Sequence, residues 1–156
     1  MEVKYAKKKS FSVIGKLGST DEGGNFIGRV WAEANQGMSK IMKYAIKDDK
    51  GLPEGIWGLM SSMDKSFSPW EDNYSKGLYL AGVEVEDTAV APLGWTRWKV
   101  PEFNYAYVKV DNNYNEVFKY VIGEFLPNNK LKLVGAVQEY YNVRENMQLY
   151  LFFPVA

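Results

Sequence analysis

Two glutamates carry the chemistry that the sequence suggests first. Glu139 lies in the segment Val137-Gln138-Glu139-Tyr140-Tyr141, and the two-residue period of a strand puts Val137, Glu139 and Tyr141 on one face. A carboxylate between an aliphatic and an aromatic neighbour is typical of a half-buried acid. The alternatives are a solvent-facing side chain on an edge strand or an ion pair with Arg144. Glu84 has a similar setting between Val83 and Val85, and a solvent-facing charge is its alternative.

Aromatic residues make up 15% of the chain, and they could surround such an acid. A carboxylate in a poorly solvated cleft with ring faces around it holds an organic cation well, since each ring adds about 0.5–2 kcal/mol of cation–π attraction. Trp95 is favoured because Gly94 beside it allows a close backbone approach. For every ring, packing in the core is the alternative. The aromatic candidates for a ligand site are Trp95, Tyr141, Tyr107, Trp57, Tyr79 and Phe153.

Composition excludes several classes of function. The chain has no Cys and no His, which removes disulfides, thiolate metal sites, cysteine nucleophiles, serine triads and most zinc chemistry. Any catalysis must therefore use carboxylates, tyrosines, lysines or backbone dipoles. The glycines do not have the spacing of a nucleotide-binding loop, and Asp21-Glu22 and Asp48-Asp49 do not have that of a calcium loop, so we expect no cofactor and no metal.

The charge balance argues against a general polyanion binder. Lys and Arg number 19, as do Asp and Glu, so the formal net charge is zero. We expect the lysines at positions 4, 7, 8 and 9 to form a solvated tail. No apolar run approaches the roughly 20 residues that span a bilayer, and the N-terminus lacks a signal-peptide apolar region. These features predict a cytoplasmic protein without a membrane segment.

The pattern of elements positions the two glutamates in strands. The order strand, helix, strand, strand is predicted twice, and in both helical segments the apolar residues recur at steps of three and four. In the first half, the helix is disturbed near Gly37. In the second, Pro127 closes it, and residues 142–146 form a turn. The predicted strands are residues 11–17, 55–63, 78–85, 103–110, 133–141 and 148–155, and the helices are 27–43 and 114–125, with residues 86–100 as the connection.

This order predicts an α+β fold made of a duplicated βαββ module. Its antiparallel sheets carry two helices, and a central cleft separates the halves, at about residues 8–87 and 96–156. Pairing the halves would bury apolar surface worth roughly 25 cal/mol per Å². The seam between them is a natural ligand site.

Several short segments resemble the GyrI-like small-molecule-binding domain, which also forms the effector-binding domain of some AraC-type and MerR-type regulators. The matches run in order over nearly the whole chain and are fairly specific for the fold. They are less specific for the ligand. The matching segments are residues 11–15, 27–31, 78–85 with Gly82-Val83-Glu84-Val85, Gly94-Trp95, Val100-Pro101, 105–107, 123–127 with Leu126-Pro127, Glu139-Tyr140 and Phe153-Pro154-Val155.

The resemblance implies a duplicated βαββ fold that binds lipophilic, often cationic, compounds in a cleft between the halves. It assigns Glu139 as the buried counter-ion, and Glu84 is a second candidate because some members bear two such acids. The chain contains no DNA-reading segment such as a helix-turn-helix, so we expect the binding domain alone, with a lipophilic or cationic small molecule as its partner.

Two other functions stay open. Some GyrI-like proteins hydrolyse strained-ring electrophiles, and here Glu139 and Glu84 would be the catalytic pair, one as a proton donor with a raised pKa. A protein-interaction role, such as antagonism of a toxin or a topoisomerase, ranks last because the chain has no acidic surface that mimics DNA. The sequence favours a binding protein over an enzyme and does not define the oligomeric state.

Overall fold

The computed structural model describes residues 1–156 and contains one antiparallel sheet of eight strands. The strand order is β1-β6-β8-β7-β3-β4-β2-β5. The α+β class and the antiparallel arrangement are confirmed, although the halves share a single sheet. The strands are β1 (Lys4–Lys8), β2 (Phe11–Ser19), β3 (Ile56–Ser61), β4 (Leu78–Val85), β5 (Thr96–Val100), β6 (Phe103–Val110), β7 (Gln138–Asn142) and β8 (Gln148–Val155).

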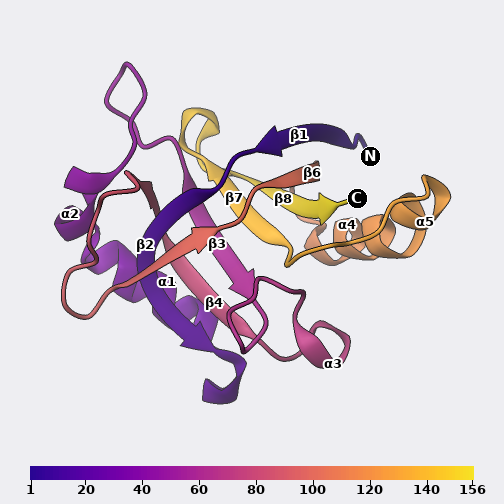
Figure 1. Ribbon diagram of the computed structural model, residues 1–156, viewed down its shortest axis with the longest axis horizontal. Helices are drawn as coiled ribbons and strands as arrows, with labels where there is room; N and C mark the ends of the chain where they lie inside the picture. Colours follow the sequence, from indigo (N-terminus) through magenta and orange to yellow (C-terminus); the bar gives the residue numbers. More distant parts are fainter.

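The duplication is visible in the order of the strands. One half contributes β2, β4 and β3, the other contributes β6, β8 and β7, and each half carries one main helix, α1 (Phe26–Gln36) or α4 (Tyr114–Tyr120). The halves meet at β3 and β7, whose ladder has three pairs: Ile56 with Tyr141, Trp57 with Tyr140, and Gly58 with Glu139. In Figure 1 the helices of the two halves lie at opposite ends of the sheet.

Both main helices cover the same face of the sheet, which we call the helical face. Val30 and Ala34 of α1 pack on the first half, and Val117 of α4 packs on the second. The opposite face carries a separate cluster of rings, and we call it the aromatic face. Its members include Phe11, Trp57, Trp98, Tyr140 and Phe152.

The helices differ in detail from the sequence prediction. The first breaks at Gly37, as expected, into α1 and α2 (Met38–Ile41). The position requires glycine, because a Cβ there would lie 2.6 Å from the Trp95 ring. The second does not end before Pro127. It continues through a π-helical turn at Val121–Phe125 into α5 (Leu126–Asn128), where the proline occupies the first turn and needs no amide partner. None of the helices is both long enough and apolar enough to cross a membrane.

Two strands lie where none was predicted. Residues 4–8 form β1 at the edge of the sheet and pair with β6, so the lysine-rich segment is not a solvated tail. Within the expected connection, residues 96–100 form β5 and pair with β2, with Trp98 and Val100 buried. Each strand extends the outer edge of one half. The strand predicted at residues 133–141 is also shorter and begins at Gln138.

Candidate functional site

Glu139 lies at the seam between the halves. Its strand, β7, forms the short ladder with β3, and the alternation of β7 directs the side chain to the helical face beside Val137 and Tyr141. The residue is only 7% exposed. No lysine or arginine forms an ion pair with it. It is therefore a buried acid without a cationic partner.

Three tyrosine hydroxyls donate to this carboxylate. Tyr114, from the first turn of α4, reaches Oε2 at 2.6 Å, and Tyr141, two residues along β7, reaches Oε1 at 3.3 Å. The third donor is Tyr79 of β4, which also bonds to Oε1 and in turn accepts from the Trp31 indole at 2.9 Å. Both halves thus supply donors to one acid.

The surroundings shift the acid–base behaviour of this group. Burial raises the pKa of Glu139 above its usual value, and the hydrogen bonds from the three tyrosines act in the opposite direction. Burial and the nearby carboxylate also raise the pKa values of Tyr79, Tyr114 and Tyr141. The phenols therefore stay protonated at neutral pH and remain hydrogen-bond donors.

Gly58 makes the meeting of Tyr79 and Glu139 possible. It pairs with Ala81 on one side and with Glu139 on the other, so it lies between the strands that carry the two side chains. A Cβ on Gly58 would be 2.0 Å from the Tyr79 hydroxyl and 2.6 Å from Glu139 Oε1. The missing side chain leaves the space in which the hydroxyl reaches the carboxylate.

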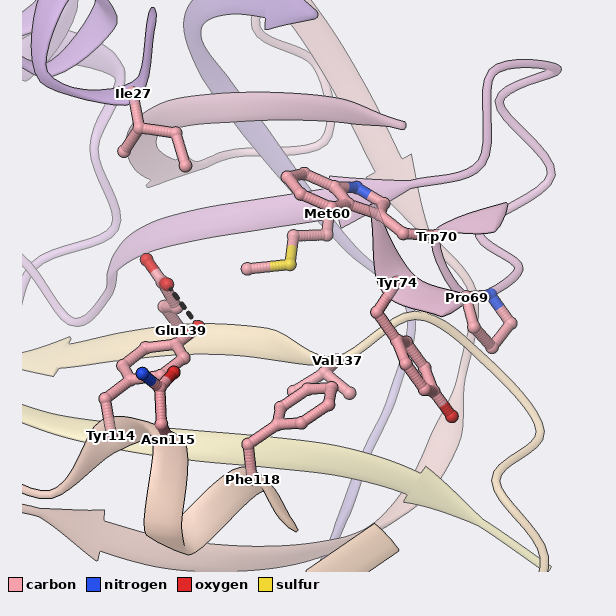
Figure 2. Close-up of a pocket in the computed structure, with 10 residues that line it drawn as sticks. All are labelled: Ile27, Met60, Pro69, Trp70, Tyr74, Tyr114, Asn115, Phe118, Val137 and Glu139. Atoms are coloured by element: carbon pink, nitrogen blue, oxygen red, sulfur yellow. Dashed lines mark hydrogen bonds between the residues drawn. The ribbon is translucent and has the colours of Figure 1, made fainter. Parts of the chain in front are cut away.

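A cleft of about 410 Å³ opens above the acid, between α1 and α4 (Figure 2). The Trp70 indole is fixed by a hydrogen bond to the Leu78 carbonyl at 2.9 Å, and Tyr74 meets Phe118 edge-on at 5.1 Å across the two halves. The walls are mostly apolar. They are formed by Ile27, Met60, Pro69, Trp70 and Tyr74 from the first half and by Tyr114, Asn115, Phe118, Val137 and Glu139 from the second.

The structure brings Tyr79 and Tyr141 to Glu139, and it places the other aromatic candidates elsewhere. Trp57 and Tyr107 lie on the aromatic face, where each contacts Phe152. Trp95 packs against α1 and α2 at Gly37, and Phe153 is fully buried beneath α4. None of these four lines the cleft. They could not be excluded from the sequence, because strand alternation alone does not tell which face of a sheet bears the cleft.

Glu84 also lies away from the cleft. It accepts a hydrogen bond from Trp57 Nε1 at 3.0 Å on the aromatic face, whereas its neighbours Val83 and Val85 pack on the helical face. The two glutamates therefore face opposite sides of the sheet. The structure does not bring them together at one site, so this arrangement gives no support to a catalytic pair acting on one substrate. No group of three potential metal ligands is present in the chain.

Most of the cleft wall consists of residues outside the predicted ligand site. Trp70 and Tyr74 lie in the polar segment between β3 and β4. The only sign of a binding role there was the presence of two rings and Pro69 in an otherwise polar stretch. Tyr114 and Phe118 belong to the predicted helical stripe, which is also the pattern of core residues. Gly58 had a signal of its own, since a glycine inside a strand often marks a close approach.

Comparisons with known proteins give matches only at the level of structure. No family model matches the chain, and no curated protein matches it. Among solved structures, SAV2435 bound to tetraphenylphosphonium superposes with a TM-score of 0.65 at 13% identity, over 100% of this chain and 94% of that chain. The C-terminal domain of EcmrR gives 0.67 at 12% identity, over 99% and 97% of the two chains. The chain has the GyrI-like fold.

Proteins with this fold are not all named as binding proteins or regulators. A hydrolase from Listeria innocua also shares it, with a TM-score of 0.59 at 12% identity over 99% of this chain and 92% of that chain. At such identities the likeness establishes the fold, and function has to be argued from the site.

Proposed function

We propose that this protein binds a lipophilic organic cation in the cleft, with Glu139 as the counter-ion. The observation that carries the proposal is the buried carboxylate without a cationic partner at the base of an apolar cleft. An isolated buried charge is unfavourable, and proteins normally pair it. A cationic ligand would supply the missing charge.

The shape and lining of the cleft suit such a ligand. Its volume of about 410 Å³ falls within the range of small-molecule sites, roughly 300–1,000 Å³. Trp70, Tyr74 and Phe118 offer ring surfaces, each worth about 0.5–2 kcal/mol to a nearby cation. The three tyrosine hydroxyls already donate to Glu139, so the ligand needs positive charge more than further hydrogen-bond donors. A bulky cation with delocalised or shielded charge fits best.

A neighbouring structure supports this choice of ligand class. SAV2435, which has the same fold, was solved with tetraphenylphosphonium, a lipophilic cation without hydrogen-bond donors. That compound is therefore the first probe to use on this protein. We infer that the protein binds its ligand without turning it over. Its cytoplasmic location stays a prediction. A protein-interaction role also stays a prediction.

Titration with tetraphenylphosphonium, followed by tryptophan fluorescence and calorimetry, tests the proposal. We expect one saturable site and at least a tenfold loss of affinity in Glu139→Gln, about 1.4 kcal/mol. Glu116→Gln is the matched control, since it removes the same charge from an exposed position on α4 and should bind as the wild type does. Neutral triphenylphosphine oxide should bind wild type and Glu139→Gln with similar affinity, because it has no positive charge for Glu139 to attract. Equal affinity of wild type and Glu139→Gln for the cation would refute the counter-ion role.

A further inference from the structure

The second buried acid, Glu84, has its own aromatic surroundings on the face opposite the cleft. It is 7% exposed. Its Oε1 accepts from the Trp57 indole at 3.0 Å, and its Oε2 lies 3.2 Å from the Lys8 ammonium. The Trp57 ring packs at 4.9 Å from Phe11 and at 4.8 Å from Tyr140. Unlike Glu139, this carboxylate already has a cation beside it.

That cation is held as an amine ligand would be held. Lys8 Nζ lies 4.6 Å from the centre of the Phe11 ring and 5.9 Å from that of Trp57, in addition to its contact with Glu84. A carboxylate and two ring faces are the elements that recognise ammonium groups. Lys8 belongs to the edge strand β1, whose backbone pairs with β6, so its side chain enters this site from a different part of the sheet.

Two cavities border the contact between Lys8 and Glu84. A cavity of about 420 Å³ lies on the side of Trp57, Tyr140 and Phe152, and one of about 390 Å³ lies on the side of Phe11 and Asp87. Lys8, Ile46 and Glu84 line both cavities. The combined walls carry four acids, Glu54, Glu84, Glu86 and Asp87, against two lysines, Lys8 and Lys9. Glu54 also pairs with Arg144, and Asp87 with Lys99. Acids thus outnumber lysines around the two cavities, and rings form part of their walls, which favours a positively charged occupant.

We propose that the aromatic face holds a second ligand site, centred on Glu84, for an organic primary ammonium, and that Lys8 is its intramolecular occupant in this structure. The primary ammonium class follows from the contacts. The present occupant, Lys8 Nζ, is itself a primary ammonium, and Glu84 Oε2 takes its bond from an N–H donor, which a quaternary ammonium or a phosphonium lacks. The neighbouring rings would receive an apolar tail.

Lys8 competes with any external amine for this site. A side chain tethered beside its site acts at an effective concentration in the millimolar range. Binding to the wild type is therefore weak, and removal of the Lys8 ammonium strengthens it. The two sites are separable, since they lie on opposite faces of the sheet and differ in the cation they accept.

Calorimetry with 2-phenylethylammonium tests this in a Glu139→Gln background, in which the cleft lacks its acid. Replacement of Lys8 by Met removes the ammonium and shortens the unbranched side chain by one atom, and we expect it to tighten binding at least tenfold. Adding Glu84→Gln should abolish the gain. Lys7→Met is the matched control, because Lys7 is exposed on the same strand and pairs with Glu102 instead. The proposal is overturned if folded Lys8→Met does not bind the amine more tightly, or if Glu84→Gln leaves the gain intact.

A second measurement needs no change at Lys8. The Trp57 indole N–H donates to Glu84, so its nitrogen–proton NMR signal reports on this carboxylate. Titration of wild type and Glu139→Gln with 2-phenylethylammonium should move the signal saturably in both, whereas neutral 2-phenylethanol should not. A signal that stays fixed up to the solubility of the amine would overturn the proposal, whatever the outcome for the cleft.

Discussion

The chemistry of the cleft depends, at the scale of single residues, on one carboxylate, three hydroxyls and one missing side chain. Alternation in the sequence correctly put Glu139 and Tyr141 on one face, and Tyr79 was among the candidates. The sequence could not show that Tyr79 reaches Glu139 across Gly58, because that contact depends on the order of strands in the sheet. Alternation likewise could not separate Tyr79 from Trp57, which faces the other side.

We expect Gly58→Ala to weaken binding of tetraphenylphosphonium at least tenfold. The new methyl group would overlap both the Tyr79 hydroxyl and Glu139 Oε1, so one of them must move. Overpacking of this kind also lowers the free energy of unfolding by about 1–3 kcal/mol. Gly28→Ala on α1 is the control, since its Cβ would meet nothing within 4 Å. Retained affinity in Gly58→Ala would show that the Tyr79–Glu139 contact does not matter for binding.

Affinity for the cation should fall as the pH is lowered through the pKa of Glu139. Burial raises that pKa, so the loss sets in at a higher pH than for an exposed glutamate, and it approaches about tenfold per pH unit below the pKa. The tyrosines do not titrate in this range. The free energy of unfolding of the ligand-free protein depends on pH in the opposite direction. It falls as the pH rises through the same pKa, because the charged form of Glu139, which burial disfavours, then appears. Calorimetric titrations with tetraphenylphosphonium across pH test this. The same pH dependence of affinity in Glu139→Gln as in wild type would contradict it.

At the scale of elements, the sequence predicted those with a clear apolar period. The bounds of β4, β6 and β8 are those expected from alternation. It failed for β1, where lysines hide the period of an exposed edge strand, and for β5, a short strand between Gly94 and Pro101. The segment between β3 and β4 could not be predicted either, because its rings are positioned by unusual backbone angles.

One of these angles gives a test of the segment. In α3 (Glu71–Tyr74), Asp72 has φ 50° and ψ 56°, a left-handed conformation that costs most residues about 1–2 kcal/mol and glycine almost nothing. Glycine loses more conformational entropy on folding, which offsets part of this gain. We therefore expect Asp72→Gly to raise the free energy of unfolding by up to about 1 kcal/mol, measured by urea unfolding. Asp49→Gly, an exposed turn position without positive φ, should not stabilise it. Lower stability of Asp72→Gly than of wild type would argue against a strained turn.

The whole molecule consists of two halves joined by a ladder of three pairs, and the cleft lies across that joint. A ligand there contacts both halves at once. At a ligand concentration of 100 times Kd, binding to the folded state adds about 2.7 kcal/mol of stability.

For a chain of this size, that gain corresponds to a rise of about 5–10 °C in Tm. Scanning calorimetry with tetraphenylphosphonium should show this rise in a single transition, and Glu139→Gln should lose most of it. Two separate transitions, of which the ligand shifts only one, would contradict a site shared by the halves.

The pairing of Gly58 with Glu139 also bears on the symmetry of the fold. Gly58 pairs with the fourth residue of β4, Ala81, and Glu139 pairs with the fourth residue of β8, Leu151, so the two occupy equivalent positions in the repeated units. An approximate two-fold axis therefore passes between them. With identical residues at this point, two carboxylates would repel each other or two glycines would provide no charge. The acid centre therefore depends on different residues at the two equivalent positions, Glu139 as the anion and Gly58 as the space beside it.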